Sequence, residues 1–228
     1  GYAETKDPGD DVDGRDACRK IAILGSLACG HHIYPDNVPA RGIRELTPLD
    51  VRAAESCDCV VKLIAWYREE ADGSLAAGVE PMLVPEHNQL AGVDDVFNAV
   101  KVKGDMLGDV VFYGKGAGKL PTASAVVADV IDALKEGAKV HDSLFWKPAP
   151  RREGLLPDPG VYAWYLRVRG VAASLLPGVA GPGDPVFEEN GEAGYYIRSA
   201  TPAQIGAVSE KIRVLGGDVA LVLKQLAD

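Results

Sequence analysis

The chain of 228 residues is 47% hydrophobic and 25% charged, so it can bury a core and form one large or two modest domains. Its formal net charge of -9 argues against nucleic acid and anionic membrane surfaces as partners, because both require clustered lysine and arginine. No apolar run reaches the roughly 18 residues of a membrane-spanning helix, and we expect no signal peptide.

The sequence has four cysteines: Cys18, Cys29, Cys57 and Cys59. They are too few and too clustered for a disulfide framework, which favours a reducing cytoplasm. Cys57 and Cys59 lack a second pair of ligands, and His31 and His32 have no partner at ligand spacing, so we expect no metal site. We interpret the two histidines as the C-terminal residues of a helix. Because residue 1 is glycine, we expect the chain to begin inside a longer gene product.

The first predicted elements are a loop and a long helix. Residues 1–11 contain Asp-Pro-Gly and Asp-Asp, which is typical of a loop, and Glu4 within them is the kind of acid that is most often solvated. Residues 13–30 have the early aspartate and the terminal glycine of a helix. Asp16 and Lys20 stand four residues apart, with the acid nearer the N-terminus, which is the favourable order for a surface ion pair. Such a pair needs no function to explain it.

The next stretch predicts a short helix followed by two hairpins. Thr47 is suited to an N-cap and Pro48 to the first turn, so a helix should run to about Ser56. β-Branched and aromatic residues then predict two antiparallel pairs: residues 60–68 with 75–84, and residues 96–103 with 110–113.

A glycine loop links the fourth predicted strand to a helix. Gly114, Gly116 and Gly118 alternate after the strand at 110–113, and an apolar repeat of 3.6 residues predicts a helix over 123–136. Free N–H groups at a helix N-terminus can line a ligand, but the spacing fails both GxGxxG and the Walker pattern. A ligand-lining loop and a tight structural turn both remain open.

The composition changes after residue 142. Residues 147–160 hold four prolines without periodicity, as a linker does. The segments that follow alternate between strand and helix patterns in the order β-α-β-β-α-β, which is ferredoxin-like. They are residues 161–169, 171–179, 186–188, 195–199, 201–215 and 219–226.

These elements predict an α+β fold with three segments. We expect a mixed, largely antiparallel sheet with the helices at 13–30 and 121–136 over one face, followed by the small ferredoxin-like unit. The predicted boundaries are a first domain at 1–146, a linker at 147–160 and a second domain at 161–228.

Several separated motifs resemble homoserine dehydrogenase over most of residues 1–136. They are GYAE at 1–4, DGRDACRK at 13–20, VPEHNQLAGVDDVFNAV at 84–100, NAVKVKGD at 98–105 and YGKGAGKLPTASAVVADVID at 113–132, in the order of the family. The resemblance implies an oxidoreductase of threonine and methionine biosynthesis that uses NADP or NAD and interconverts L-aspartate 4-semialdehyde and L-homoserine. The amino-terminal dinucleotide-binding domain of the family is not among these residues, so the chain alone should be inactive.

The resemblance also assigns roles to residues. It implies that Glu4 contacts the amino group of the amino-acid substrate, that Asp16 binds substrate and that Lys20 transfers the proton. A lysine suits hydride transfer to an aldehyde, because the developing alkoxide needs a proton and a nearby cation. The glycine loop of Gly114, Gly116 and Gly118 is expected to line the cofactor.

The C-terminal unit resembles the ACT domain that follows many homoserine dehydrogenases, which implies a regulatory or oligomerising role. Residues 170–172 replace the Asp-x-Pro-Gly turn that the family carries after the first strand. The family also implies a homodimer. The alternative is a dimerising or amino-acid-sensing module without chemistry; Glu4, Asp16 and Lys20 together favour the enzyme, because such a module needs none of them.

Overall fold

The computed structural model describes residues 8–136, 145–148 and 155–227. Its centre is a six-stranded sheet with the strand order β1-β2-β8-β5-β7-β6. The strands are β1 (Cys59–Glu69), β2 (Leu75–Pro85), β5 (Tyr162–Arg169), β6 (Gly183–Glu189), β7 (Glu192–Ala200) and β8 (Asp218–Gln225). All neighbours are antiparallel except β2 and β8, so the prediction of a mixed, largely antiparallel sheet in an α+β fold is confirmed.

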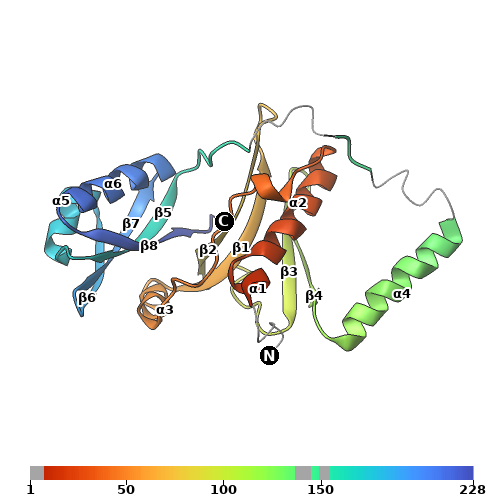
Figure 1. Ribbon diagram of the computed structural model, residues 1–228, viewed down its shortest axis with the longest axis horizontal. Coiled ribbons are helices and arrows are strands. Elements are labelled where there is room, and N and C mark those ends of the chain that lie inside the picture. The colour runs from red at the N-terminus through yellow and green to blue at the C-terminus, as the bar shows by residue number, and fades with distance from the viewer. Residues whose placement is uncertain (1–7, 137–144, 149–154, 228) are drawn as a thin grey trace.

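The parallel contact between β2 and β8 joins the two halves of the chain. Met82 pairs with Lys224 and Leu83 pairs with Gln225. The N–H of Leu226 then donates to the carbonyl of Leu83 at 2.8 Å. The sheet therefore continues from the early hairpin β1–β2 into the late strands, with β8 between them (Figure 1).

Helices cover opposite faces of this sheet in its two halves. Helix α2 (Arg15–Cys29) packs against β1 and β2, and α3 (Pro48–Glu55) packs beside Leu83, Tyr165 and Leu223 on the same face. Helices α5 (Leu176–Ala180) and α6 (Pro202–Val214) pack on the other face, over Trp164 and Leu166. The alternation of side chains along β5 explains this division, because Tyr165 lies between residues that point the opposite way.

The N-terminal helices begin and end at local signals in the sequence. A four-residue helix, α1 (Gly9–Val12), replaces the end of the loop predicted at residues 1–11, and Gly14, with a φ of 76°, separates it from α2. Gly30 ends α2 in the left-handed conformation, and its N–H donates to the Ser26 carbonyl at 3.0 Å. A capping box formed by Thr47 and Asp50 begins α3, as the Thr-Pro sequence predicts.

The second hairpin and its helix correct one prediction. Strands β3 (Phe97–Gly104) and β4 (Gly108–Lys115) pair only with each other, and α4 (Lys119–Glu136) extends away from the main sheet (Figure 1). The apolar side chains of α4 are 42–58% exposed at Val126, Val127, Val130 and Ile131. The prediction that this helix covers the sheet beside α2 is wrong, because a helical repeat identifies an apolar face but not the surface that it meets.

The C-terminal elements lie close to their predicted positions. In chain order they are β5, a 3-10 turn at Ala173–Leu175 that leads into α5, then β6, β7, α6 and β8. Thr201 and Gln204 form a capping box at the start of α6. No helix in the described part of the chain is long and apolar enough to cross a membrane.

Candidate functional site

The predicted proton-transfer pair lies on the outer face of α2. Lys20 Nζ is 2.6 Å from Asp16 Oδ2, and the two side chains are 63% and 44% exposed. Cys18 and Ala22 take the positions that face β1 and β2, so the helical period turns Asp16 and Lys20 toward solvent. An exposed pair of this kind contributes less than about 1 kcal/mol to stability, so the fold does not depend on it. Glu4, the predicted partner of the substrate amino group, lies outside the described residues.

The turn before α2 is held by hydrogen bonds and by packing. The N–H of Ile43 donates to the carbonyl of Val12 at 2.8 Å. Arg44 donates from Nη2 to Asp13 Oδ2 at 3.1 Å and from Nε to Oδ1 of the same carboxylate. The hydrogen bond from Arg44 lowers the pKa of Asp13. Asp16 follows only three residues later, so these contacts set where α2 begins.

Each predicted cofactor glycine has its own local environment. A Cβ at Gly116 would lie 2.2 Å from Asn98 Nδ2, so this glycine permits close packing within the β3–β4 hairpin. Gly118 has a φ of 109°, which a residue with a side chain rarely adopts. Gly114 has open space around it. Gly118 thus has a backbone reason to be glycine, whereas a side chain at Gly116 would require the exposed Asn98 side chain to move. Among the described contacts, no hydrogen bond or ion pair joins this loop to Asp16 or Lys20.

The histidines after α2 correct another prediction. The helix ends at Cys29, so His31 and His32 belong to the connection that follows rather than to the helix. Trp146 Nε1 donates to His32 Nδ1 at 2.8 Å, and His31 forms a bridge with Lys147. These contacts fasten residues 145–148 beside the end of α2. Within the described ranges, no group of three or more His, Cys, Asp or Glu side chains is placed to hold a metal ion.

A buried charged cluster around Arg167 was missed by the sequence reasoning. Arg167 is 2% exposed, and its Nε donates to Asp50 Oδ1 at 2.9 Å, while Tyr165 Oη donates to the same oxygen at 2.9 Å. Arg167 also donates to Glu192 at 3.1 Å and to the carbonyl of Glu45 at 2.8 Å. Asp50 is fully buried. The sequence signal for this cluster was an arginine within a predicted strand, two residues from Tyr165 and therefore on the same face of the sheet.

A second charged cluster lies on the opposite face of the sheet. Lys224 is 4% exposed and lies 2.8 Å from Asp158 and 2.9 Å from Glu80. Its ammonium group stands 4.4 Å from the ring centroid of Trp66 and 4.7 Å from that of Tyr162. Burial opposes ionisation of Asp158, but the hydrogen bonds from Lys224, the Gly160 N–H and Tyr162 outweigh it and lower the pKa of Asp158 to about 2.

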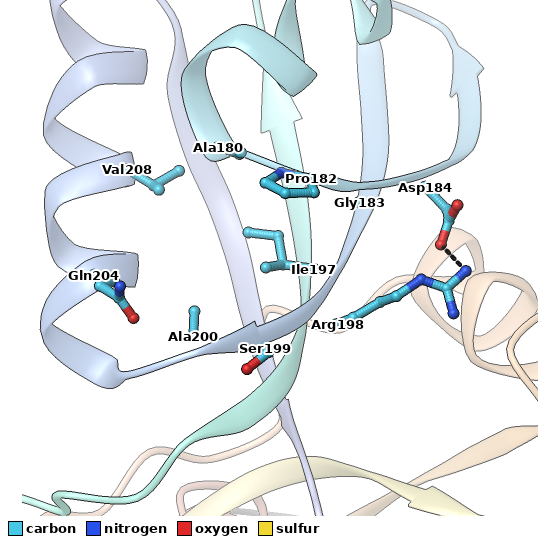
Figure 2. Close-up of a pocket in the computed structure, with 11 residues that line it drawn as sticks. Ala180, Pro182, Gly183, Asp184, Ile197, Arg198, Ser199, Ala200, Gln204 and Val208 are labelled. Atoms are coloured by element: carbon cyan, nitrogen blue, oxygen red, sulfur yellow. Dashed lines mark hydrogen bonds and ion pairs between the residues drawn. The ribbon is translucent and has the colours of Figure 1, made fainter.

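A hollow of about 540 Å³ lies in the C-terminal unit, between α5, β7 and α6. Figure 2 shows its apolar wall at Ala180, Ile197 and Val208, with the ion pair of Asp184 and Arg198 at one edge. Of the predicted catalytic, substrate and cofactor residues that the structure describes, none lines it.

Comparisons with known proteins give the family context for these elements. A family model described as homoserine dehydrogenase matches residues 1–131. A homoserine dehydrogenase of Neisseria gonorrhoeae is 42% identical over 175 residues, which cover 74% of this chain and 40% of that protein. One of Synechocystis is 47% identical over 137 residues, which cover 59% of this chain and 31% of that protein.

Two solved structures extend the similarity over nearly the whole chain. The homoserine dehydrogenase of Thiobacillus denitrificans matches with a TM-score of 0.78 and 31% identity, covering 98% of this chain and 55% of that one. The S. aureus enzyme at pH 6.5 matches with a TM-score of 0.74 and 28% identity, covering 99% of this chain and 56% of that one. The chain thus spans about half the length of these structures and less than half of the curated relatives.

Proposed function

The chain belongs to the homoserine dehydrogenase family, and on that basis we propose that it supplies the substrate-binding and C-terminal parts of an enzyme that interconverts L-aspartate 4-semialdehyde and L-homoserine. This reaction belongs to threonine and methionine biosynthesis, which we assign to the cytoplasm. The observation that carries the proposal is the Asp16–Lys20 pair, 2.6 Å apart on the exposed face of α2.

The chemistry assigned to this pair follows from the reaction. When the aldehyde is reduced, its carbon receives a hydride and its oxygen must receive a proton to become the alcohol. The Lys20 ammonium can donate that proton and offset the negative charge on the oxygen as it develops. Asp16 forms an ion pair with Lys20, orients the ammonium and has a second carboxylate oxygen left to contact a polar group of the substrate. Oxidation of homoserine reverses these steps, with Lys20 taking the proton.

The hydride requires a nicotinamide cofactor, NADP or NAD, which the described residues do not enclose. The spacing of Gly114, Gly116 and Gly118 fails the dinucleotide fingerprint, and Gly116 is already packed against Asn98. We therefore assign this loop at most to one edge of a cofactor site that needs residues beyond this chain. On this basis the chain alone is expected not to oxidise NADPH or NADH with aspartate semialdehyde.

We assign the C-terminal unit, residues 161–228, to an ACT-like domain, after a first domain at 1–146 and a linker at 147–160. Support comes from the order of its elements and from the strand order β8-β5-β7-β6, which places the first and third strands of the unit in its centre. The continuous sheet connects this unit to the first domain through β8 and β2.

Homodimerisation is part of the proposal. The β3–β4 hairpin exposes Val100, Val102 and Phe112 at 41%, 49% and 64%, which is a large apolar surface for a small two-stranded sheet. A second copy of the chain is the partner that the family implies.

The alternative is a non-catalytic dimerising or amino-acid-sensing module. The hollow in the C-terminal unit favours it, because an apolar wall next to the carboxylate of Asp184 and the guanidinium of Arg198 suits a small zwitterion. The alternative gives no role to Lys20, so a variant of Lys20 separates the two functions.

Replacement of Lys20 tests the enzymatic function in the native gene product. Lys20→Ala is expected to lower kcat for homoserine oxidation by a factor of about 100 to 10,000, the usual contribution of a general acid or base. Thermal unfolding followed by circular dichroism should stay close to that of the wild type, because Lys20 is 63% exposed. Lys211→Ala, which removes another exposed helical lysine, is the matched control. Turnover of Lys20→Ala within twofold of wild type would remove the assigned role.

A further inference from the structure

A short segment of residues 41–45, called here the bridging segment, contacts both the C-terminal unit and the turn before α2. It belongs to neither a helix nor a strand of the sheet. Its first and last residues contact the C-terminal strands, and the three residues between them contact the turn before α2.

The bridging segment and the C-terminal unit each donate one hydrogen bond to the other. Arg41 Nη2 donates to the carbonyl of Val222 in β8 at 2.5 Å. Arg167 in β5 donates from Nη2 to the carbonyl of Glu45 at 2.8 Å. Arg167 is 2% exposed and is itself fixed by Asp50 and Glu192, so it offers the bridging segment a rigid anchor.

The bridging segment also contacts the turn before α2. Ile43 donates to the Val12 carbonyl, and Arg44 holds the Asp13 carboxylate through two nitrogens. A Cβ at Gly42 would lie 2.0 Å from the Val12 oxygen and 2.5 Å from the Asp13 Cα. On the other side of the turn, a Cβ at Gly14 would lie 2.9 Å from Val79 Cγ1 of β2. The turn is therefore packed between the bridging segment and the sheet and cannot move independently of either.

The position of this turn determines where Asp16 and Lys20 lie. Asp16 is the second residue of α2 and Lys20 lies about one helical turn further on, so a displacement of residues 12–14 carries both side chains with it. Catalytic groups are sensitive to such shifts, because a misplacement of about 1 Å can lower a rate by a factor of about 100.

We propose that the bridging segment is a positioning element through which the C-terminal unit fixes the placement of Asp16 and Lys20. The inference rests on the proposed function for its kinetic readout, but its structural readout does not depend on activity. Under this proposal, hydrogen bonds connect the C-terminal unit to the turn that precedes Asp16 and Lys20, so the coupling does not depend on proximity alone.

The first test changes the fit of the bridging segment in the native gene product without removing a charge. Gly42→Ala is expected to lower kcat for homoserine by about 10- to 100-fold and to raise the KM for homoserine, because it displaces the turn before α2. Gly206→Ala, where a Cβ meets nothing within 4 Å, is the matched control. A purely structural role would lower the folded fraction, measured by circular dichroism, and the apparent kcat in proportion, and would leave KM unchanged.

The second test addresses each side of the bridging segment by hydrogen exchange. In Arg44→Ala and in Arg41→Ala, amide exchange at residues 18–21, where the N–H groups of α2 first have helical acceptors, is expected to become at least about 10-fold faster, and Arg44→Lys should restore part of the protection. Arg213→Ala, which breaks an exposed ion pair with Glu210 in α6, is the control. These variants decide the inference even if Gly42→Ala does not fold.

The outcomes separate the inference from the proposed function. A wild-type protein without homoserine dehydrogenase activity would overturn the proposed function, while the exchange measurements would still decide the positioning role. If Arg41→Ala leaves the exchange of residues 18–21 unchanged, the hydrogen bond from Arg41 to β8 does not hold the turn before α2, and the inference fails even if the enzyme is active.

Discussion

Asp50→Asn should destabilise the protein far more than its conservative size suggests. Asp50 is fully buried and accepts four hydrogen bonds, from the N–H and hydroxyl of Thr47 at 2.8 Å and from Tyr165 and Arg167 at 2.9 Å. Asparagine keeps the volume but replaces one oxygen with an NH₂ group that faces donors. It also removes the negative charge beside Arg167, which is 2% exposed.

The expected magnitude follows from the partners that remain. Breaking a buried ion pair by removing one partner costs about 3–5 kcal/mol. Glu192 still lies 3.1 Å from Arg167, so the loss should be near the lower limit, about 3 kcal/mol. At roughly 2–4 °C of Tm per kcal/mol for a chain of this size, Tm should fall by roughly 6–12 °C.

Urea unfolding followed by far-ultraviolet circular dichroism measures this loss directly. Asp184→Asn is the matched control, because Asp184 forms an ion pair with Arg198 at 2.6 Å while both side chains are more than half exposed. The control should cost less than about 1 kcal/mol. A loss below about 1 kcal/mol for Asp50→Asn as well would refute the reasoning that Arg167 depends on the buried charge of Asp50.

Three further predictions concern pH, effector binding and assembly. Asp158→Asn should cost about 2 kcal/mol at pH 7 and progressively less as the pH falls from about 4 toward 2, because the native pKa is about 2 and the ordinary value is 3.8. If the difference in unfolding free energy between Asp158→Asn and wild type stays constant as the pH falls, the lowered pKa of Asp158 is not its cause. Threonine should not bind in calorimetric titration at micromolar concentrations, because residues 170–172 replace the Asp-x-Pro-Gly turn of the family; micromolar binding would favour the sensing module. Light scattering should give twice the chain mass of 24.1 kDa, and a monomer would exclude the homodimer.

The sequence predicted individual elements well because their signals are local. The Thr-Pro start of α3, the glycine that ends α2 and the strand patterns of the C-terminal unit each depend on residues within a few positions of one another. The order of the sheet was not predictable in the same way. The parallel contact of Met82 with Lys224 joins residues more than half the chain apart, and nothing in either local pattern specifies it.

In the candidate site, too, local features were predictable from the sequence and long-range contacts were not. The spacing of Asp16 and Lys20 predicts their ion pair, because four residues on a helix bring two side chains together. The bridging segment and the Arg167 cluster depend on contacts between distant segments, such as Arg167 with Glu45, which no motif records. The position of α4 could not be predicted either, because its apolar stripe specifies burial without naming a partner.

The central place of β8 has a consequence for how the chain folds during its synthesis. Strand β8 begins at Asp218, more than 130 residues after β2 ends at Pro85, yet it fills the gap between β2 and β5. At a translation rate of about 5–20 residues per second, β5 is synthesised several seconds after β2, and β8 is synthesised later still. Until it arrives, two strands that are interior in the finished sheet are open edges, which other chains can pair with. Nascent chains of this protein should therefore be most prone to aggregation just before β8 is made, and slow folding should follow from a sheet that closes with its most distant contact.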